Sequence, residues 1–569
     1  MDVQPSTKTI QSLIRSWANG DIQIPPFQRP YVWPIRKTLN LLDSLYRRYP
    51  IGAIFLWRPS EKSKLRPKRR QYGYRRTDFA YYVIDGQQRL TSLAVAFGSF
   101  EMFHQTNKRS LQCALELTTD DAKGDGFRLT RLFHSPANKN ERQGLLLNDA
   151  PTRVPLRDVT GLEQIERLRG RKKKELKETG HTNKQIEDAT KRIDQASGIL
   201  ERPVPIFTIE DATDDQVVAM FKRLNGGAGL RRADIQAADL GRGPSIAVLE
   251  KIREFVGEHD GKGPAAQVGF NFGFAFRALV VFHTGNAQFG KDPKEDWARD
   301  RAGHKLMESW RRSQRSLEKA IDFVDVELGW SRRGLLPSAN ALIPMAVALD
   351  KAGNKLTQRD KLNYMRWLCL SALRGIFSGA VETKINECLR AINGPGGAPS
   401  ERLLNALSNA SRRSVKASEL LEEGTPVWGG GTQVMLAYLV QARAKDWDDG
   451  KLLSTLSKQG MPESRTGNLS VHHILPRKLA KSRDATAAKV NCIANYAIIS
   501  ADLNSTYGDS APEDVFTESL TRAQLSRAEV QFFDKHAVDL LKNRGYEEFR
   551  RDRAKRLAAN LNKWLQLSR

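Results

Sequence analysis

Residues 471–476 read Val-His-His-Ile-Leu-Pro, and residues 492–500 read Cys-Ile-Ala-Asn-Tyr-Ala-Ile-Ile-Ser. The first stretch is short, β-prone and stopped by a proline, so it predicts a strand that ends in a turn. The chain holds nine histidines, and two of them, His472 and His473, are consecutive in this strand. Neighbouring residues of a strand face opposite ways, so we expect the two imidazoles to point in different directions. The second stretch predicts an apolar strand that carries one asparagine, Asn495.

A histidine pair followed by Asn495 and then by Asn504 resembles the HNH (ββα-metal) nuclease motif, in which a β-hairpin and one helix surround a divalent ion. The resemblance implies that His473 is the general base and that His472 stands where the family often has an aspartate ligand. It also implies that Asn504 is the last metal ligand and that Asn495 holds the loop and orients the base. Neutral imidazole can deprotonate water near pH 7, and a cation stabilises the charge that develops on the phosphate. Since imidazole replaces the usual carboxylate, the choice between Mg²⁺, Mn²⁺ and a softer ion stays open.

A second motif lies near the other end of the chain, where residues 83–90 read Val-Ile-Asp-Gly-Gln-Gln-Arg-Leu. This pattern predicts a strand, an Asp-Gly turn and then a helix from about Gln87 to Phe97. Backbone amides at the helix start, together with Arg89, would form an anion site, and the glycine would let a phosphate approach the backbone. Asp85 would hold a metal bound to that phosphate or orient a water. A plain turn with a surface arginine is the simpler alternative.

Two further stretches accompany this motif. Residues 24–33 read Ile-Pro-Pro-Phe-Gln-Arg-Pro-Tyr-Val-Trp, and Phe-Lys-Arg-Leu-Asn-Gly-Gly begins at Phe221, with a leucine at Leu230. With the Asp-Gly-Gln-Gln-Arg motif between them, they resemble the ParB/sulfiredoxin-like N-terminal domain of GmrSD-type restriction proteins, and the HNH segment sits where that family has its nuclease domain. By this resemblance the chain is identified as a modification-dependent (type IV-like) restriction endonuclease, SspE-like or BrxU-like.

The resemblance implies defence against phage by a nuclease that binds and hydrolyses a nucleoside triphosphate, expected to be GTP, and senses phosphorothioate linkages or modified cytosine in DNA. The residues implied for the nucleotide are Asp85, Gly86, Gln87, Gln88, Arg89, Arg223 and Asn225. Those implied for the same pocket or for sensing the mark are Gln28, Arg29, Tyr31 and Trp33. Core packing is the alternative role for Tyr31 and Trp33, and helix-end packing for Arg223 and Asn225.

Charge points independently to nucleic acid. The sequence has 91 Lys and Arg against 65 Asp and Glu, a formal net charge of +26. Basic residues gather in three runs, near 62–76, 171–174 and 550–556, and such runs neutralise phosphates without reading a base sequence. The residues expected to contact DNA are Lys68, Arg69, Arg70, Lys172, Lys173, Arg550 and Arg551. Each run taken alone is more often a solvated face.

The fold class expected is α+β and multidomain, because 569 residues correspond to about two to four domains. We expect a ParB/sulfiredoxin-like α/β domain at 1–240 with a charged helical pair near 161–200. A mostly helical connecting region would follow at 245–455, and an HNH domain with a basic C-terminal helix at 456–569. Strands are predicted at 51–57, 81–84 and 204–209, and helices at 38–48 and 214–224.

The remaining expectations concern location and partners. The N-terminal residues lack the basic start and apolar run of a signal peptide, and no uncharged apolar stretch is long enough to span a bilayer, so a cytoplasmic protein without membrane contact is expected. The four cysteines are scattered, which fits a reducing compartment. A homodimer would allow a double-strand cut, and a DNA-modification system of the same host is a further expected partner.

Two alternatives from other classes stay open at this point. In one, the chain is a nucleotide-switched, ParB-like DNA-binding protein with an inactive HNH domain, and His472 in place of aspartate favours it. In the other, the nuclease acts on RNA, although the sequence contains no RNA-recognition module.

Overall fold

The structure is a computed structural model that describes residues 1–25, 28, 33, 35–61, 63, 80–97, 109–118, 127–133, 151–159, 162–225, 246–257, 268, 270–288, 304–459, 466–483, 485–486, 488–515, 521–543 and 545–567. The chain divides into two compact units. Unit 1 comprises Met1–Gly263 and Pro293–Gly303, and unit 2 comprises Pro264–Asp292 and His304–Arg569. The division into 1–240, 245–455 and 456–569 stays a prediction. Helices and small sheets are mixed, which confirms the α+β class at that level.

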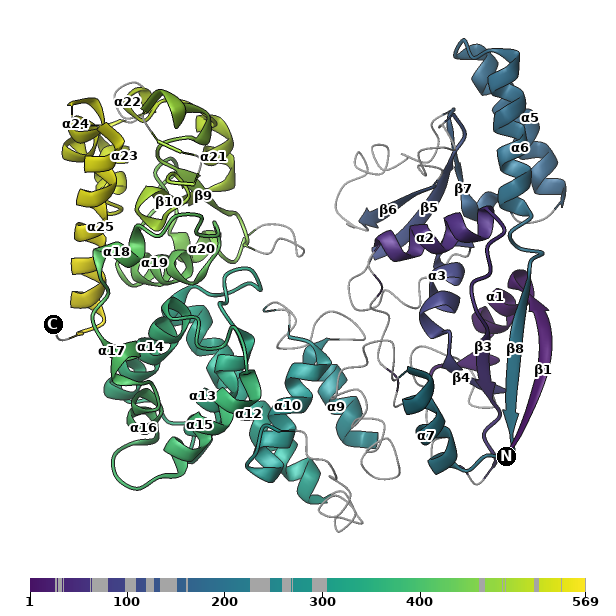
Figure 1. Ribbon diagram of the computed structural model, residues 1–569, viewed down its shortest axis with the longest axis horizontal. Helices are drawn as coiled ribbons and strands as arrows, with labels where there is room; N and C mark the ends of the chain where they lie inside the picture. Colours follow the sequence, from purple (N-terminus) through teal and green to yellow (C-terminus); the bar gives the residue numbers. More distant parts are fainter. Residues whose placement is uncertain are drawn as a thin grey trace. The chain divides into compact units, whose positions relative to one another are not determined.

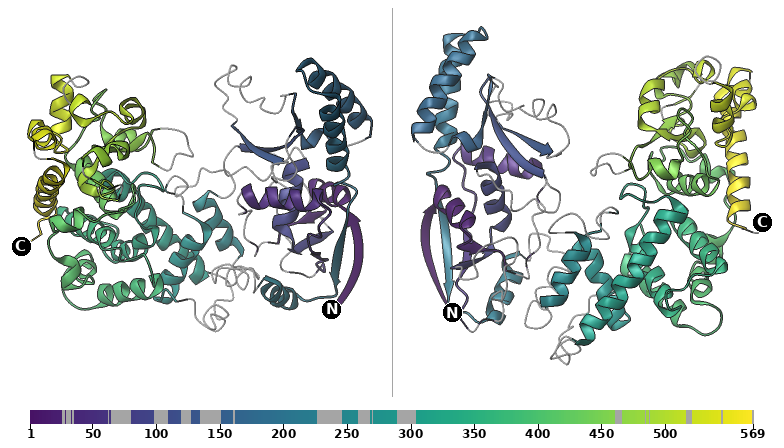
Figure 2. Two further views of the ribbon diagram at one scale, coloured as in Figure 1. Left: turned by 45° about the horizontal axis from the view of Figure 1, so that its top comes forward. Right: turned by 180° about the vertical axis from the view of Figure 1, so that it is seen from behind.

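Unit 1 is built on a five-stranded mixed sheet in the order β1-β8-β3-β4-β2 (Figures 1 and 2). β1 runs antiparallel to β8, β8 parallel to β3, β3 antiparallel to β4, and β4 parallel to β2. The three strands predicted from apolar runs are confirmed as β3, β4 and β8. The strands are β1 (Asp2–Thr9), β2 (Ile22–Gln23), β3 (Ile54–Trp57), β4 (Tyr81–Asp85) and β8 (Pro203–Glu210).

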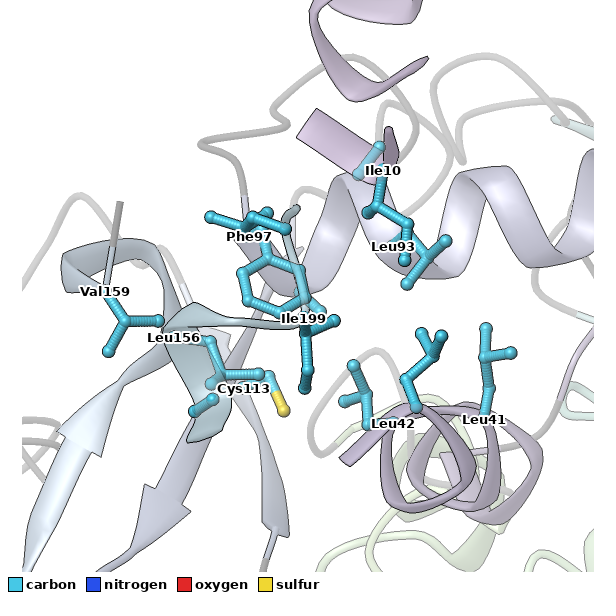
Figure 3. Close-up of a cluster of buried hydrophobic side chains, with 14 of the residues drawn as sticks. Ile10, Leu41, Leu42, Leu93, Phe97, Cys113, Leu156, Val159 and Ile199 are labelled. Atoms are coloured by element: carbon cyan, nitrogen blue, oxygen red, sulfur yellow. The ribbon is translucent and has the colours of Figure 1, made fainter. Parts of the chain in front are cut away.

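Helices cover both faces of this sheet. Side chains from α1 (Ile10–Ala18), α2 (Ile35–Tyr46) and α3 (Gln87–Phe97) form the larger core with one face of the sheet. Figure 3 shows part of this core, where Leu41 and Leu42 of α2 point toward Leu93 of α3. On the other face α7 (Asp214–Asn225) packs against Trp57, Tyr82 and Ile84. The helices predicted at 87–97 and 214–224 are thereby confirmed, and the one predicted at 38–48 lies largely within α2.

A second, three-stranded antiparallel sheet adjoins the larger core, in the order β6-β5-β7. Residues 161–200, with their charged helical pattern, contain an α-hairpin that projects away from the five-stranded sheet (Figure 1). A capping box between Thr182 and Gln185 starts its second helix. The elements are β5 (Arg109–Glu116), β6 (Phe127–Phe133), β7 (Arg153–Pro155), the 3₁₀ turn η3 (Leu156–Asp158), α5 (Leu162–Glu178), α6 (Asn183–Ser197) and α9 (Ile246–Val256).

The first part of unit 2 consists, in its described residues, mainly of helices joined by turns and loops. Its core contains the fully buried indoles of Trp310, Trp330 and Trp367. The elements are α10 (Phe272–Thr284), α12 (His304–Leu328), η5 (Ala339–Ala341), α13 (Leu342–Lys351), α14 (Gln358–Leu373), α15 (Val381–Asn393), α16 (Pro399–Asn405), α17 (Asn409–Arg412), α18 (Ala417–Leu420), α19 (Gly430–Gln441) and α20 (Leu453–Leu456).

The second part of unit 2 has a separate core around Trp447, Phe533 and Phe549. A two-stranded antiparallel sheet, β9 with β10, lies beside this core together with several helices. The elements are β9 (Leu469–His473), η6 (Arg477–Leu479), η7 (Lys481–Arg483), η8 (Ile493–Asn495), β10 (Tyr496–Ser500), α21 (Ala501–Tyr507), α22 (Pro512–Asp514), α23 (Arg522–Glu529), α24 (Lys535–Asn543) and α25 (Gly545–Trp564). None of the helices in the described ranges has the length and apolar composition that crossing a membrane requires.

Candidate functional site

The histidine pair lies on a hairpin followed by a helix. β9 and β10 pair antiparallel, with His472 opposite Ala497 and His473 opposite Tyr496, and α21 follows β10 without a break. Ser500 is the N-cap of α21, since its hydroxyl accepts a hydrogen bond from the Leu503 amide. The buried Asp446 carboxylate in turn accepts from the Ser500 amide at 2.7 Å and from its hydroxyl at 2.9 Å. The start of α21, and with it Asn504, is therefore fixed relative to β10.

His472 turns toward this helix. Its Nδ1 lies 3.2 Å from Oδ1 of Asn504, and its ring packs edge-on against Trp447 and Tyr507. The residue is 4% exposed. Burial lowers the pKa of His472 to about 4, so the imidazole is neutral at pH 7.

The His472–Asn504 pair fits a divalent cation in two respects. A metal-binding imidazole must be neutral, as this one is. Two ligand atoms at right angles around an ion with bonds of about 2.1 Å are about 3 Å apart, close to the 3.2 Å between these two atoms. Within the described ranges no three His, Cys, Asp or Glu side chains gather as a ligand set. An ion held by this pair would need waters or phosphate oxygens to complete its coordination, and the choice between Mg²⁺, Mn²⁺ and a softer ion stays a prediction.

His473 turns the other way and packs edge-on against the Tyr496 ring at 5.0 Å between centroids. Its Nε2 lies 3.0 Å from Oδ1 of Asn491, and the Arg477 Nε donates to the same atom at 3.0 Å. Arginine can only donate, so this atom of Asn491 is the oxygen, and the His473 Nε2 must carry a proton to donate to it. The lone pair of the neutral ring therefore sits on Nδ1. Burial lowers the pKa of His473, which favours the neutral ring.

Asn495 is fully buried and ties the two ends of the loop together. Its side-chain amide donates to the carbonyls of Leu475 and Val490 at 3.0 and 2.9 Å, and its oxygen accepts from the Leu475 amide at 2.9 Å. This geometry suits the loop-holding part of its expected role. The partner that orients the His473 ring is Asn491, which the sequence analysis missed. The signal available was an asparagine directly before the stretch 492–500.

The C-terminal basic run is used largely for internal contacts. Arg553 is completely buried, and its guanidinium donates to the carbonyls of Ala494, Tyr496 and Gln531 at 2.6–2.8 Å. Burial lowers the pKa of Arg553 to about 9. Arg550 is 7% exposed and pairs with Glu547 at 2.7 Å, whereas the Arg551 side chain is 56% exposed. Of the two residues expected to contact DNA here, only Arg551 presents its charge to solvent.

In unit 1 the Asp-Gly-Gln-Gln-Arg motif joins β4 to α3. Gly86 has φ +93°, and a Cβ there would lie 2.9 Å from Cγ1 of Ile54. Arg89 donates to the carbonyls of Ile51 at 2.5 Å and Ala53 at 2.9 Å and pairs with Asp85 at 2.8 Å. The guanidinium therefore bonds to groups of the protein itself, and it connects the residues before β3 to the start of α3. Phosphate binding by Arg89 stays a prediction.

Other predicted residues of unit 1 contact the same connection between β4 and α3. The Gln28 side chain is buried and donates to the carbonyls of Val83 and Ile84 at 2.6 and 2.8 Å. The Trp33 amide donates to Oε1 of Gln88 at 3.2 Å, and its ring packs against the larger core, as in the core-packing alternative. Gln87 is buried at the start of α3.

The other residues expected in the nucleotide or DNA contacts are scattered. Arg223 is exposed on α7, and Lys173 is exposed on α5. Lys172 is 2% exposed and pairs with Glu175 at 2.7 Å, so its charge does not face solvent. Arg29, Tyr31, Lys68, Arg69, Arg70 and the side chain of Asn225 lie outside the described residues.

A comparison with family models decides what unit 1 is similar to. Residues 10–240 match the GmrSD restriction endonuclease, N-terminal domain. The match includes the β4–α3 joint and the stretch that begins at Phe221, and it covers less than half of the chain. What the match shows is similarity of this region to the N-terminal domain of a restriction endonuclease family. The β9–β10–α21 site lies outside the matched region. No curated protein matches the chain.

Proposed function

We propose that this chain is a metal-dependent endonuclease that nicks or cuts modified DNA at the β9–β10–α21 site. One observation carries the proposal: a neutral His473, with its lone pair on Nδ1, directly follows His472 on β9, and His472 contacts Asn504 of α21. A base beside a pair of cation ligands is what phosphodiester hydrolysis requires. The resemblance of this segment to HNH nucleases and the family match of residues 10–240 support the same reading.

The residues divide the work as follows. His473 Nδ1 accepts a proton from the attacking water, while the Nε2 hydrogen bond to Asn491 keeps that nitrogen protonated and the ring oriented. His472 and Asn504 would hold the cation, and Asn495 keeps the loop between β9 and β10 closed. When bound, Mg²⁺ or Mn²⁺ supplies positive charge that stabilises the phosphate and the leaving oxygen. The net charge of +26 would bring the DNA backbone to the protein.

Unit 1 would regulate this site. We propose that Asp85, Gly86, Gln87 and Gln88 bind the phosphates of a nucleoside triphosphate, expected to be GTP, and that the domain senses phosphorothioate or modified cytosine. What supports this is a helix that begins directly after a strand-end Asp-Gly, within the region that matches the family. The chemistry of nucleotide hydrolysis is not assigned to Arg89, because its donors are engaged by Ile51, Ala53 and Asp85.

A plasmid-nicking assay tests the proposal. Wild-type protein and His473→Ala would be incubated with Mg²⁺ or Mn²⁺, with and without GTP, on unmodified, hydroxymethylcytosine-containing and phosphorothioated plasmids. The proposal expects cleavage of one modified DNA by the wild type alone, and GTP hydrolysis by both proteins. A double-strand product would favour a homodimer, and the DNA that is cut would identify the modification system of the host.

The alternative function is a nucleotide-switched DNA-binding protein whose HNH domain is inactive. Imidazole at position 472, where the family often has aspartate, is the observation that favours it. It expects GTP hydrolysis and DNA binding without cleavage of any of the three plasmids. Cleavage that His473→Ala abolishes would exclude it.

A further inference from the structure

Unit 2 contains a cavity of about 270 Å³ whose lining includes three aromatic side chains. Trp330 and Phe377 line it and are 1% and 7% exposed, and the half-buried Trp428 lines it as well. The cavity lies where α14 meets the first turn of α19. Its volume is slightly below the usual range of sites for drug-sized ligands. A single ring system with a substituent is smaller than such a ligand and would fit.

The start of helix α19 forms part of the cavity lining. Gly429 is the N-cap of α19 and supplies no side chain to accept from the first amides of this twelve-residue helix. The chain approaches α14 so closely here that a Cβ on Gly430 would lie 2.2 Å from the Ala372 carbonyl oxygen. A helix start of this kind presents N–H donors and partial positive charge to an acceptor.

A second, independent observation in the same cavity is a buried hydroxyl group without a hydrogen-bond partner in the part of the chain that the structure describes. Ser371 of α14 is 4% exposed and lines the cavity, and its hydroxyl has no hydrogen-bond partner among the described residues. A buried hydroxyl without a partner costs about 1–3 kcal/mol, so a ligand that bonds to it would recover this loss. The ligand that fits is therefore flat and aromatic, with oxygen or nitrogen atoms on its edge.

The rim of the cavity is bonded to the candidate catalytic loop. The segment 424–428 leads into α19, and its Thr425 amide donates to the Asn491 carbonyl at 2.9 Å. The Tyr496 hydroxyl donates to the Thr425 carbonyl at 2.7 Å. Asn491 and Tyr496 are also the two residues that contact the His473 ring. A ligand held between Trp428 and the start of α19 would therefore contact a segment that is itself bonded to Asn491 and Tyr496, the neighbours of the proposed general base His473.

We propose that this cavity binds a single unstacked nucleobase of the DNA substrate. The inference rests on the proposed function, since it takes DNA as the substrate of unit 2. The base would stack on Trp428 or its aromatic neighbours and place its edge acceptors against the α19 amides and the Ser371 hydroxyl. A nucleobase bound there would restrict the motion of segment 424–428, which contacts Asn491 and Tyr496. Cleavage would therefore be favoured close to an unpaired or extruded nucleotide.

Fluorescence anisotropy of the full chain with two labelled duplexes tests this proposal. The duplexes share one sequence and differ by a single bulged nucleotide, and EDTA prevents cleavage. The wild type is expected to bind the bulged duplex at least about fivefold more tightly than the perfect one. Trp428→Ala is expected to lose this preference and to keep its affinity for the perfect duplex, while Trp428→Phe retains most of it. Trp564→Ala, which removes a half-buried tryptophan that does not line the cavity, is the matched control and keeps the preference.

Ser371→Ala is a second, milder variant. It is expected to weaken the preference for the bulged duplex without lowering the unfolding midpoint. The test can therefore be decided even if Trp428→Ala folds poorly. No preference in the wild type, or an undiminished preference in both Trp428→Ala and Ser371→Ala, would overturn the base site. If the wild type still bound and cut DNA, the proposed function would survive that result. A wild type that bound neither duplex would overturn both.

Discussion

At the scale of single residues, Asn491 decides which nitrogen of His473 carries the proton. Replacing it by leucine removes the acceptor at nearly constant size, so the ring is free to turn and to exchange tautomers. We expect Asn491→Leu to slow single-turnover DNA cleavage about 10- to 100-fold. Asn491→Asp keeps an acceptor at the same place and is expected to recover most of the rate. Wild-type cleavage by Asn491→Leu would show that the contact does not position the base.

His472 is a second residue with a measurable consequence. Its pKa of about 4 in the folded chain lies below the value of about 6.5 for an unfolded histidine. The unfolded chain therefore binds this proton first as the pH falls, and stability is lost between about pH 6.5 and pH 4. We expect His472→Asn to remove about 3 kcal/mol of that loss in the free energy of unfolding of the metal-free protein. Urea unfolding at several pH values measures it.

The exposed His536 of α24 provides the control for that experiment. His536→Asn makes the same replacement at an exposed position of α24. If His472→Asn unfolded with the same pH dependence as the wild type, the neutral, buried state of His472 would be contradicted.

At the scale of elements, α25 holds the segment that leads into β10 through one buried arginine, Arg553. Arg553→Leu would leave the carbonyls of Ala494, Tyr496 and Gln531 without this donor, at about 1 kcal/mol or more each. We expect a loss of about 3 kcal/mol, seen as a fall of several degrees in the thermal midpoint of unit 2. Arg551→Leu, on the exposed side of the same helix, should change stability by less than about 0.5 kcal/mol. Equal thermal midpoints for the two variants would contradict a stabilising role of Arg553.

The β4–α3 joint makes a parallel prediction in unit 1. Gly86→Ala adds a Cβ at φ +93° that would lie 2.9 Å from the Ile54 side chain. Gly180, in the turn between α5 and α6, has φ +82° but open space around it, so Gly180→Ala carries only the backbone strain. We expect Gly86→Ala to cost about 1–3 kcal/mol more than Gly180→Ala in denaturant unfolding. A difference near zero would mean that packing at this joint is loose.

The sequence predicts some elements far better than others. The strands β3, β4 and β8 were predictable because each is an apolar run bounded by turn residues. β1 was not, because Asp2–Thr9 is mostly exposed and owes its extended form to pairing with β8, some two hundred residues away in the chain. Order in a mixed sheet depends on such long-range pairs, which no local pattern encodes.

The candidate site divides in the same way. His472, His473, Asn495 and Asn504 could be found from residue type and order, and the structure brings His472 and Asn504 together. Asn491 stands directly before the predicted strand, but which asparagine contacts His473 depends on how the loop folds. The role of Arg553 was not predictable, because it depends on burial. Lys172 and Arg550 were expected at the surface, but long basic side chains can fold beneath it and pair there.

At the scale of the whole molecule, the two units carry different motifs: the match to the GmrSD N-terminal domain lies in unit 1 and the His472–His473 hairpin in unit 2. The proposed nuclease site lies on this hairpin. The decisive experiment is nicking of supercoiled, modified plasmid as Mg²⁺ or Mn²⁺ is added, with wild type, His473→Ala and His536→Ala compared at equal concentration. We expect metal-dependent nicking by the wild type and by His536→Ala, and a loss of at least about 100-fold in His473→Ala. Equal nicking by all three proteins, or none with either metal on any modified DNA, would contradict the proposed site.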